Sequence, residues 1–116
     1  MKIHVQSQGF TLTNAIREHA EHRLNLALTR SSEHIKRVEM RLSDINGPRG
    51  GADKRCSIVV ELESMPDVVI EDIETDLYVA IDRAADRASL SVGRSIERKR
   101  GHVTDPRSAF APPETD

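Results

Sequence analysis

The segment DLYVAIDRAADRASLSVGRSIERK at residues 76–99 decides the fold. At 100° per residue, its apolar side chains fall within an arc of about 120° on one helical face. They are Leu77, Ile81, Ala84, Ala85, Ala88, Val92 and Ile96. Small alanine side chains on that face allow the helix to sit close to whatever supports it. The segment therefore predicts a long amphipathic helix that packs on another layer.

Period-two alternation elsewhere predicts a sheet as that layer. In residues 35–45, Val38, Met40 and Leu42 point to one side and charged side chains point to the other. Three further segments are predicted as strands: residues 2–7, 54–63 and 68–73. Outward charges on the last of these suit an edge strand, because charge discourages edge-to-edge aggregation.

A second amphipathic helix is predicted over residues 14–29, where apolar side chains recur at helical spacing. The hydroxyl of Thr11 or Thr13 can cap it by accepting a hydrogen bond from a free amide of the first turn. Arg23 falls within the apolar stripe, and we expect its long side chain to snorkel at the stripe's edge.

The resulting order, β-α-β-β-β-α, predicts an α+β fold. A right-handed crossover makes the first two strands parallel neighbours, and hairpins add the others antiparallel. We therefore expect a four-stranded mixed sheet with two helices packed on one face, and the other face left to water or a partner. Residues 1–100 form the predicted domain. Residues 101–116 hold three of the five prolines and no periodicity, so they are predicted to be a disordered tail.

Composition restricts the class of protein. A chain of 116 residues suits one domain, and its single cysteine excludes an internal disulfide and a cysteine-cluster metal site. Three Phe and Tyr residues and no Trp predict an aliphatic core and disfavour base stacking. No apolar run approaches the roughly 20 residues that span a bilayer, and the first residues lack an export signal. We expect a cytoplasmic protein with no membrane partner.

No catalytic constellation emerges. Cys56 takes an inward strand position, which predicts a small buried hydrophobe. His19 and His22 lack a third metal ligand. Residues 61–76 contain seven acids and no base, but the acids are predicted on outward strand faces, where they protect an edge or repel a partner. We expect no enzyme activity, no cofactor, no metal and no small-molecule substrate.

Four arginines define what we call the arginine stripe. They lie within about 60° of one another on the last helix and span roughly 22 Å. They are Arg83, Arg87, Arg94 and Arg98. One interpretation is a solubilising face; the other is a phosphate-binding face, because guanidinium groups bind phosphates through paired hydrogen bonds.

Acids on the same helix balance this stripe only in part. Asp86 and Glu97 lie three positions after stripe arginines and can relieve their repulsion, whereas Arg87 has no acid at helical spacing. Lys99 and Arg100 extend the positive charge at the helix end, where the helix dipole favours cations.

The order of elements and three local motifs resemble a known family. The motifs are TNAIRE at residues 13–18, RVEMRLS at 37–43 and DLYVAID at 76–82, the last followed by the Ala/Arg helix. Over residues 1–100 the chain resembles the ribosome hibernation promoting factors, or ribosome-associated inhibitors of the protein Y type, historically called sigma-54 modulation proteins. Here the resemblance is to the short, single-domain form.

The resemblance implies a stress-associated factor that binds the small ribosomal subunit where mRNA and tRNA sit, and silences idle ribosomes. Its implied rRNA contacts on this chain are Arg23, Arg87, Arg94 and Arg98, with Arg37, Arg41, Lys54 and Arg55 as additional contacts from the sheet and loop. The predicted rRNA-binding set also includes Arg83, Lys99 and Arg100. A protein-interaction or dimerisation module of the same fold, weakly homodimeric and without ribosome binding, is the alternative.

Overall fold

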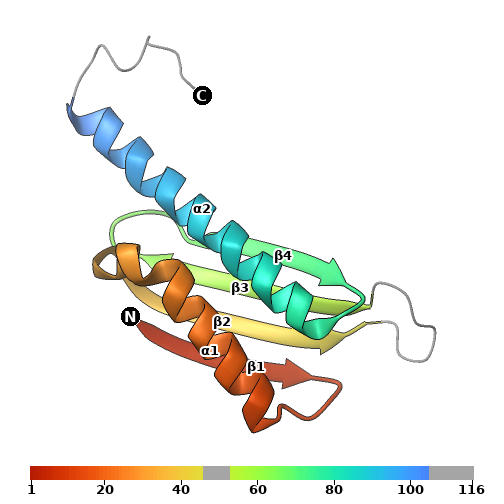
Figure 1. Ribbon diagram of the computed structural model, residues 1–116. Helices are drawn as coiled ribbons and strands as arrows, with labels where there is room; N and C mark the ends of the chain where they lie inside the picture. Colours follow the sequence, from red (N-terminus) through yellow and green to blue (C-terminus); the bar gives the residue numbers. More distant parts are fainter. Residues whose placement is uncertain (46–52, 105–116) are drawn as a thin grey trace.

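The computed structural model describes residues 1–45 and 53–104, and its element order is the predicted one (Figure 1). Two helices and four strands follow one another in the order β-α-β-β-β-α that the sequence patterns indicated. Their bounds are β1 (Lys2–Gln8), α1 (Asn14–Leu28), a 3-10 turn η1 (Thr29–His34), β2 (Ile35–Asp44), β3 (Lys54–Leu62), β4 (Val68–Glu74) and α2 (Leu77–Thr104).

The strands form one mixed sheet in the order β1-β2-β3-β4. β1 runs parallel to β2, with Val5 opposite Met40, and the β2–β3 and β3–β4 pairs are antiparallel. β4 is therefore an edge strand, as predicted. Both helices lie on one face of the sheet (Figure 1), so the predicted α+β architecture is confirmed.

The core lies between this face and the helices. β2 and β3 supply alternate buried side chains, among them Met40 and Ile58, while Leu24 of α1 packs against them without exposed surface. The alanines of α2 are buried, which lets this helix lie close over β3 and β4 (Figure 1). The core is aliphatic, as the composition predicted.

Local signals set the ends of α1. The Oγ1 atom of Thr13 accepts a hydrogen bond from the amide of Ile16 at 3.2 Å, so Thr13 is the cap of the two threonines that the sequence offered. α1 ends at Leu28, and the chain tightens into η1 before β2 begins.

α2 is longer than predicted. It continues to Thr104, five residues beyond the expected end at residue 99, and projects past the sheet (Figure 1). A glycine inside a helix costs about 1 kcal/mol relative to alanine, so Gly101 alone does not stop it. The predicted disordered tail therefore begins with helical residues. Its remainder, residues 105–116, lies outside the described residues, as does the segment of residues 46–52.

α1, with 15 residues, is shorter than a typical membrane-spanning helix, and the longer α2 carries many charged side chains. Within residues 1–45 and 53–104, neither helix combines the length and apolar character needed to cross a bilayer.

Candidate nucleic-acid interface

The arginine stripe lies on the exposed side of α2. All four of its arginines are exposed, whereas the alanines on the opposite side of the helix are buried against the sheet. The stripe therefore lies on the side of α2 that faces away from the buried apolar arc. The two ends of the stripe nevertheless differ in what surrounds them.

Acids of β4 hold the N-terminal half of the stripe. The Nε atom of Arg83 lies 3.6 Å from a carboxylate oxygen of Glu74. A terminal nitrogen of Arg87 donates to the backbone carbonyl of Glu71 at 2.8 Å and lies 3.7 Å from Oδ1 of Asp72. Arg87 has no acid at helical spacing on α2, and the neighbouring strand supplies one.

These contacts correct the predicted placement of the acidic segment. Asp72 and Glu74 share the helix-facing side of β4 with Val68 and Ile70, and their side chains are only 16% and 26% exposed. Glu71 points to the other face, as predicted. The alternation of β4 forces this division, because successive side chains point to opposite faces.

The C-terminal half of the stripe is less constrained. Arg98 makes one long contact of 3.4 Å with the Ser95 hydroxyl on its own helix. Arg94 is exposed and makes no ion pair with any residue of 1–45 or 53–104. Two guanidinium groups, one turn apart, are therefore presented to the surroundings with little to neutralise them.

Contrary to the prediction, Arg23 does not snorkel at the edge of the apolar stripe but links the two helices. Its guanidinium reaches from α1 to α2, where it donates to Asp86 at 2.8 Å and to Asp82 at 2.9 Å. The hydrogen bond to Asp86 raises the pKa of Arg23 above its usual value, although burial acts in the opposite direction. Nε2 of His19 lies 2.9 Å from the same Asp82 oxygen. Asp86 thus pairs across the helices and does not relieve Arg83 along its own helix.

The sheet arginines lie on the opposite side of the molecule from α2. Arg37 pairs with Glu61 at 3.3 Å, and Arg55 pairs with Glu71 at 3.5 Å, each across neighbouring strands of the uncovered face. Arg41 is exposed on that face. The structure therefore does not bring these predicted contacts together with the arginine stripe.

The remaining residues of the predicted rRNA-binding set lie at opposite ends of the molecule. Nζ of Lys54 lies 3.2 Å from Asp44 and 3.3 Å from Asp53, and hydrogen bonding, first to Asp44 and then to Asp53, raises the pKa of Lys54. Lys99 and Arg100 line a pocket at the far end of α2. The sequence did not predict this pocket, because its walls come from three distant segments.

Cys56 lies in the core, as predicted, with none of its surface exposed. Burial, helped by the nearby Asp72 carboxylate, raises the pKa of its thiol to about 12. The thiolate form needed for nucleophilic chemistry is therefore scarce at neutral pH.

We expect this thiol to resist alkylation by iodoacetamide at pH 8 until the protein unfolds. A folded-state pKa above the unfolded value of about 8.5 means that stability is complete below that pH and falls as pH rises toward 12, by at most about 1.4 kcal/mol per pH unit. Urea unfolding at pH 8, 9 and 10, compared between wild type and Cys56→Val, isolates this contribution from the other titrating groups. Rapid alkylation of the native protein would contradict the prediction.

The histidines whose side chains the structure describes belong to no metal-binding cluster. His19 is engaged with Asp82 and stacks edge-on against Tyr78 at a centroid distance of 4.8 Å. Across the described part of the chain, no group of three or more histidine, cysteine or acidic side chains is arranged to hold a metal ion.

Comparison with known proteins agrees with this fold. The family model described as "Sigma 54 modulation protein / S30EA ribosomal protein" matches residues 3–100. The chain belongs to this family. Membership confirms the resemblance drawn from the order of elements and the three motifs. No curated protein sequence matches the chain significantly.

Solved structures similar to this S30EA family member include two whose length it covers almost entirely. The N-terminal domain of Protein Y from Thermus thermophilus is 32% identical, with a TM-score of 0.66 over 81% of this chain and 98% of that one. A ribosomal subunit interface protein from Coxiella burnetii has a TM-score of 0.70 over 84% of this chain and 99% of that one. At 19% identity, the second likeness shows a common fold alone.

Proposed function

We propose that this protein is a non-enzymatic translation factor that binds the small ribosomal subunit through rRNA phosphates and blocks the mRNA and tRNA sites under stress. Family membership and the similarity to Protein Y support ribosome association. The observation that carries the mode of binding is the exposed pair Arg94 and Arg98, which lack carboxylate partners among residues 1–45 and 53–104.

The remaining basic residues contribute unequally to this proposed interface. Arg83 and Arg87 border the same surface, but a phosphate has to compete with the β4 acids for them. Arg23 is occupied between the helices, so we assign it a positioning role and not a phosphate contact. The predicted contacts on the sheet bind rRNA only if the ribosomal site also reaches the uncovered face. They include Arg37, Arg41 and Arg55.

Co-sedimentation with purified ribosomal subunits over a series of salt concentrations tests the proposal. About six phosphate contacts give a slope of log affinity against log salt of about -4 to -5. Recovery of the protein in the small-subunit fraction, with affinity falling steeply as salt rises, is the expected result. Salt-insensitive behaviour with a dimer in light scattering would instead identify an interaction module that works through the uncovered sheet face or the β4 edge.

Neutralising the competing acids should strengthen binding. In Asp72→Asn/Glu74→Gln, Arg87 and Arg83 lose their carboxylate partners and become available to phosphates. Because ion pairs with an exposed basic partner are worth about 0–1 kcal/mol each, we expect affinity for the small subunit to rise by about threefold to tenfold at low salt. The measurement is the same co-sedimentation titration.

A matched control removes the same charge elsewhere. Glu18→Gln/Glu33→Gln neutralises two exposed acids on α1 and η1 and leaves the stripe's neighbours intact. Equal gains for the two variants would attribute the effect to net charge and would contradict competition at the stripe.

A further inference from the structure

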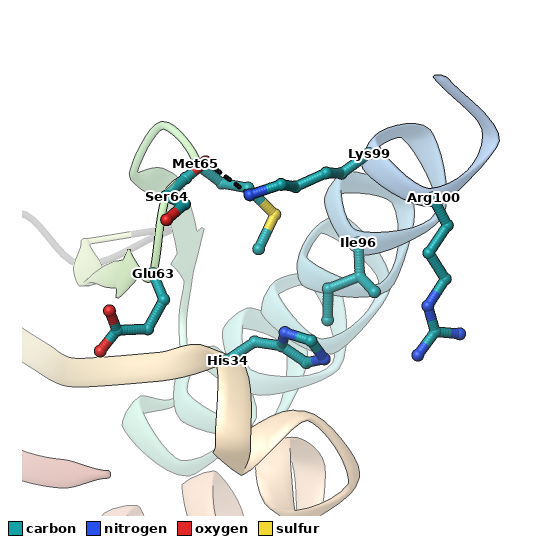
Figure 2. A pocket seen from close by; sticks show the side chains of 7 residues that line it. All are labelled: His34, Glu63, Ser64, Met65, Ile96, Lys99 and Arg100. Atoms are coloured by element: carbon teal, nitrogen blue, oxygen red, sulfur yellow. Dashed lines mark hydrogen bonds between the residues drawn. The ribbon is translucent and has the colours of Figure 1, made fainter. Parts of the chain in front are cut away.

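A pocket of about 400 Å³ opens at the far end of α2 (Figure 2). The end of η1, the turn between β3 and β4, and the last turns of α2 form its walls. Ile96, which is 8% exposed, and the half-buried Met65 give it an apolar base. Its volume falls in the range of about 300–1,000 Å³ that is typical of small-ligand sites.

The polar groups of this pocket are arranged asymmetrically. The imidazole of His34 points toward Ile96, and Lys99 and Arg100 extend on either side of that isoleucine (Figure 2). The carboxylate of Glu63 points away from them. The groups around the apolar base are therefore a planar ring and two cations, a combination that suits a flat apolar group carrying negative charge.

The turn between β3 and β4 holds one of these cations in place. Nζ of Lys99 donates to the backbone carbonyl of Ser64 at 3.2 Å, and Ser64 itself takes the left-handed conformation with φ of 61°. This contact uses one of the three donors of the ammonium group, and the others remain for an anion.

We propose that this pocket receives one unstacked nucleotide of a single-stranded RNA segment. Histidine rings and arginine guanidinium planes are the groups on which proteins stack splayed-out bases. His34 and Arg100 can hold the base over Ile96, and Lys99 can bind its phosphate. Lys99 and Arg100 directly follow Arg98 but lie about 100° and 200° further round the helix. A strand whose phosphates track the stripe therefore has to turn around the end of α2 to reach the pocket. The inference rests on the proposed function and adds a base contact to it.

This assignment changes one expectation from composition. The scarcity of Phe, Tyr and Trp disfavoured base stacking, but that count leaves out histidine and arginine, which also present flat faces. An acidic peptide with a large apolar side chain is the competing occupant. It needs cations and an apolar base but no planar ring, so His34 favours the nucleotide.

The test compares two short strands of equal phosphate number, one a natural single-stranded RNA and the other abasic. Fluorescence anisotropy measures the affinity of the full chain for each. The wild type should bind the natural strand about fivefold to a hundredfold more tightly, since stacking of one base contributes on that scale. His34→Ala should remove this preference and leave binding of the abasic strand unchanged, whereas His34→Phe should retain it.

His22→Ala is the matched control, because His22 is exposed on α1, an element that contributes no residue to the pocket lining. Equal affinity of the wild type for both strands, or loss of the preference in His22→Ala as well, would overturn the proposal. Displacement of the RNA by a leucine-containing glutamate-rich peptide, in a His34-independent manner, would reassign the pocket to acidic peptides. Tighter binding of free AMP than of the strand would reassign it to a free nucleotide.

The strand-binding experiment tests the pocket, and co-sedimentation tests the proposed function, so either can fail without the other. Salt-dependent co-sedimentation with the small subunit, combined with no base preference, would overturn the pocket and keep the function. A His34-dependent base preference without ribosome binding would do the reverse.

Discussion

Arg94→Glu/Arg98→Glu is expected to lower the affinity for the small ribosomal subunit by about a hundredfold or more at low salt. These two arginines are the exposed members of the stripe that no described carboxylate neutralises. Reversal removes two charge-assisted contacts, each worth about 1.5–3 kcal/mol, and adds repulsion. The slope of log affinity against log salt should also decrease in magnitude by about 2, because two phosphate contacts are lost.

The control for this experiment carries the same change in net charge. Arg17→Glu/Arg30→Glu reverses two exposed arginines on α1 and η1, away from the stripe. We expect it to reduce affinity only severalfold, through the general field of the protein. If both double variants bind equally weakly, or if the stripe variant binds as wild type, the phosphate contacts do not lie on α2.

Leu24→Ala should produce the largest loss of stability among single truncations of α1. Leu24 has none of its surface exposed and packs between α1 and the sheet. Removing a buried leucine loses transfer free energy and leaves a cavity, at a combined cost of about 2–5 kcal/mol. Urea unfolding monitored by circular dichroism should show a lower midpoint with an unchanged slope.

Leu26→Ala is the control on the same helix, two positions away. Leu26 is 61% exposed, so its truncation should change the free energy of unfolding by no more than about 0.5 kcal/mol. Similar losses for the two variants would mean that α1 does not pack through the face that contains Leu24.

The fold was predictable because its determinants are local. Alternation in residues 35–45 and the apolar arc of residues 76–99 specify their elements from local sequence. Antiparallel pairing of strands that follow one another in the chain then fixes most of the sheet order. The predicted end of α2, at residue 99, was wrong by five residues. A single glycine at position 101 is a weak stop signal against a long helical run.

The surroundings of the site were harder to predict because they depend on distant pairs. Arg23 and Asp86 are separated by 63 positions and meet only once both helices lie on the sheet. Arg87 finds Asp72 only because strand alternation turns that acid toward α2. Helical spacing located the stripe correctly, but it could not tell which of its arginines already had partners.

The paired arginines bear on selectivity as well as affinity. A free phosphate or a flexible polyanion offers Arg83 and Arg87 little more than Glu74 and Asp72 already provide, so exchange of partners brings little gain. A rigid surface that presents several phosphates at matching positions can engage all four arginines at once. Glu74 and Asp72 thereby weaken binding to any partner that cannot replace both ion pairs at once. They would keep this slightly acidic protein from binding other nucleic acids non-specifically before it reaches a surface whose phosphates match the stripe.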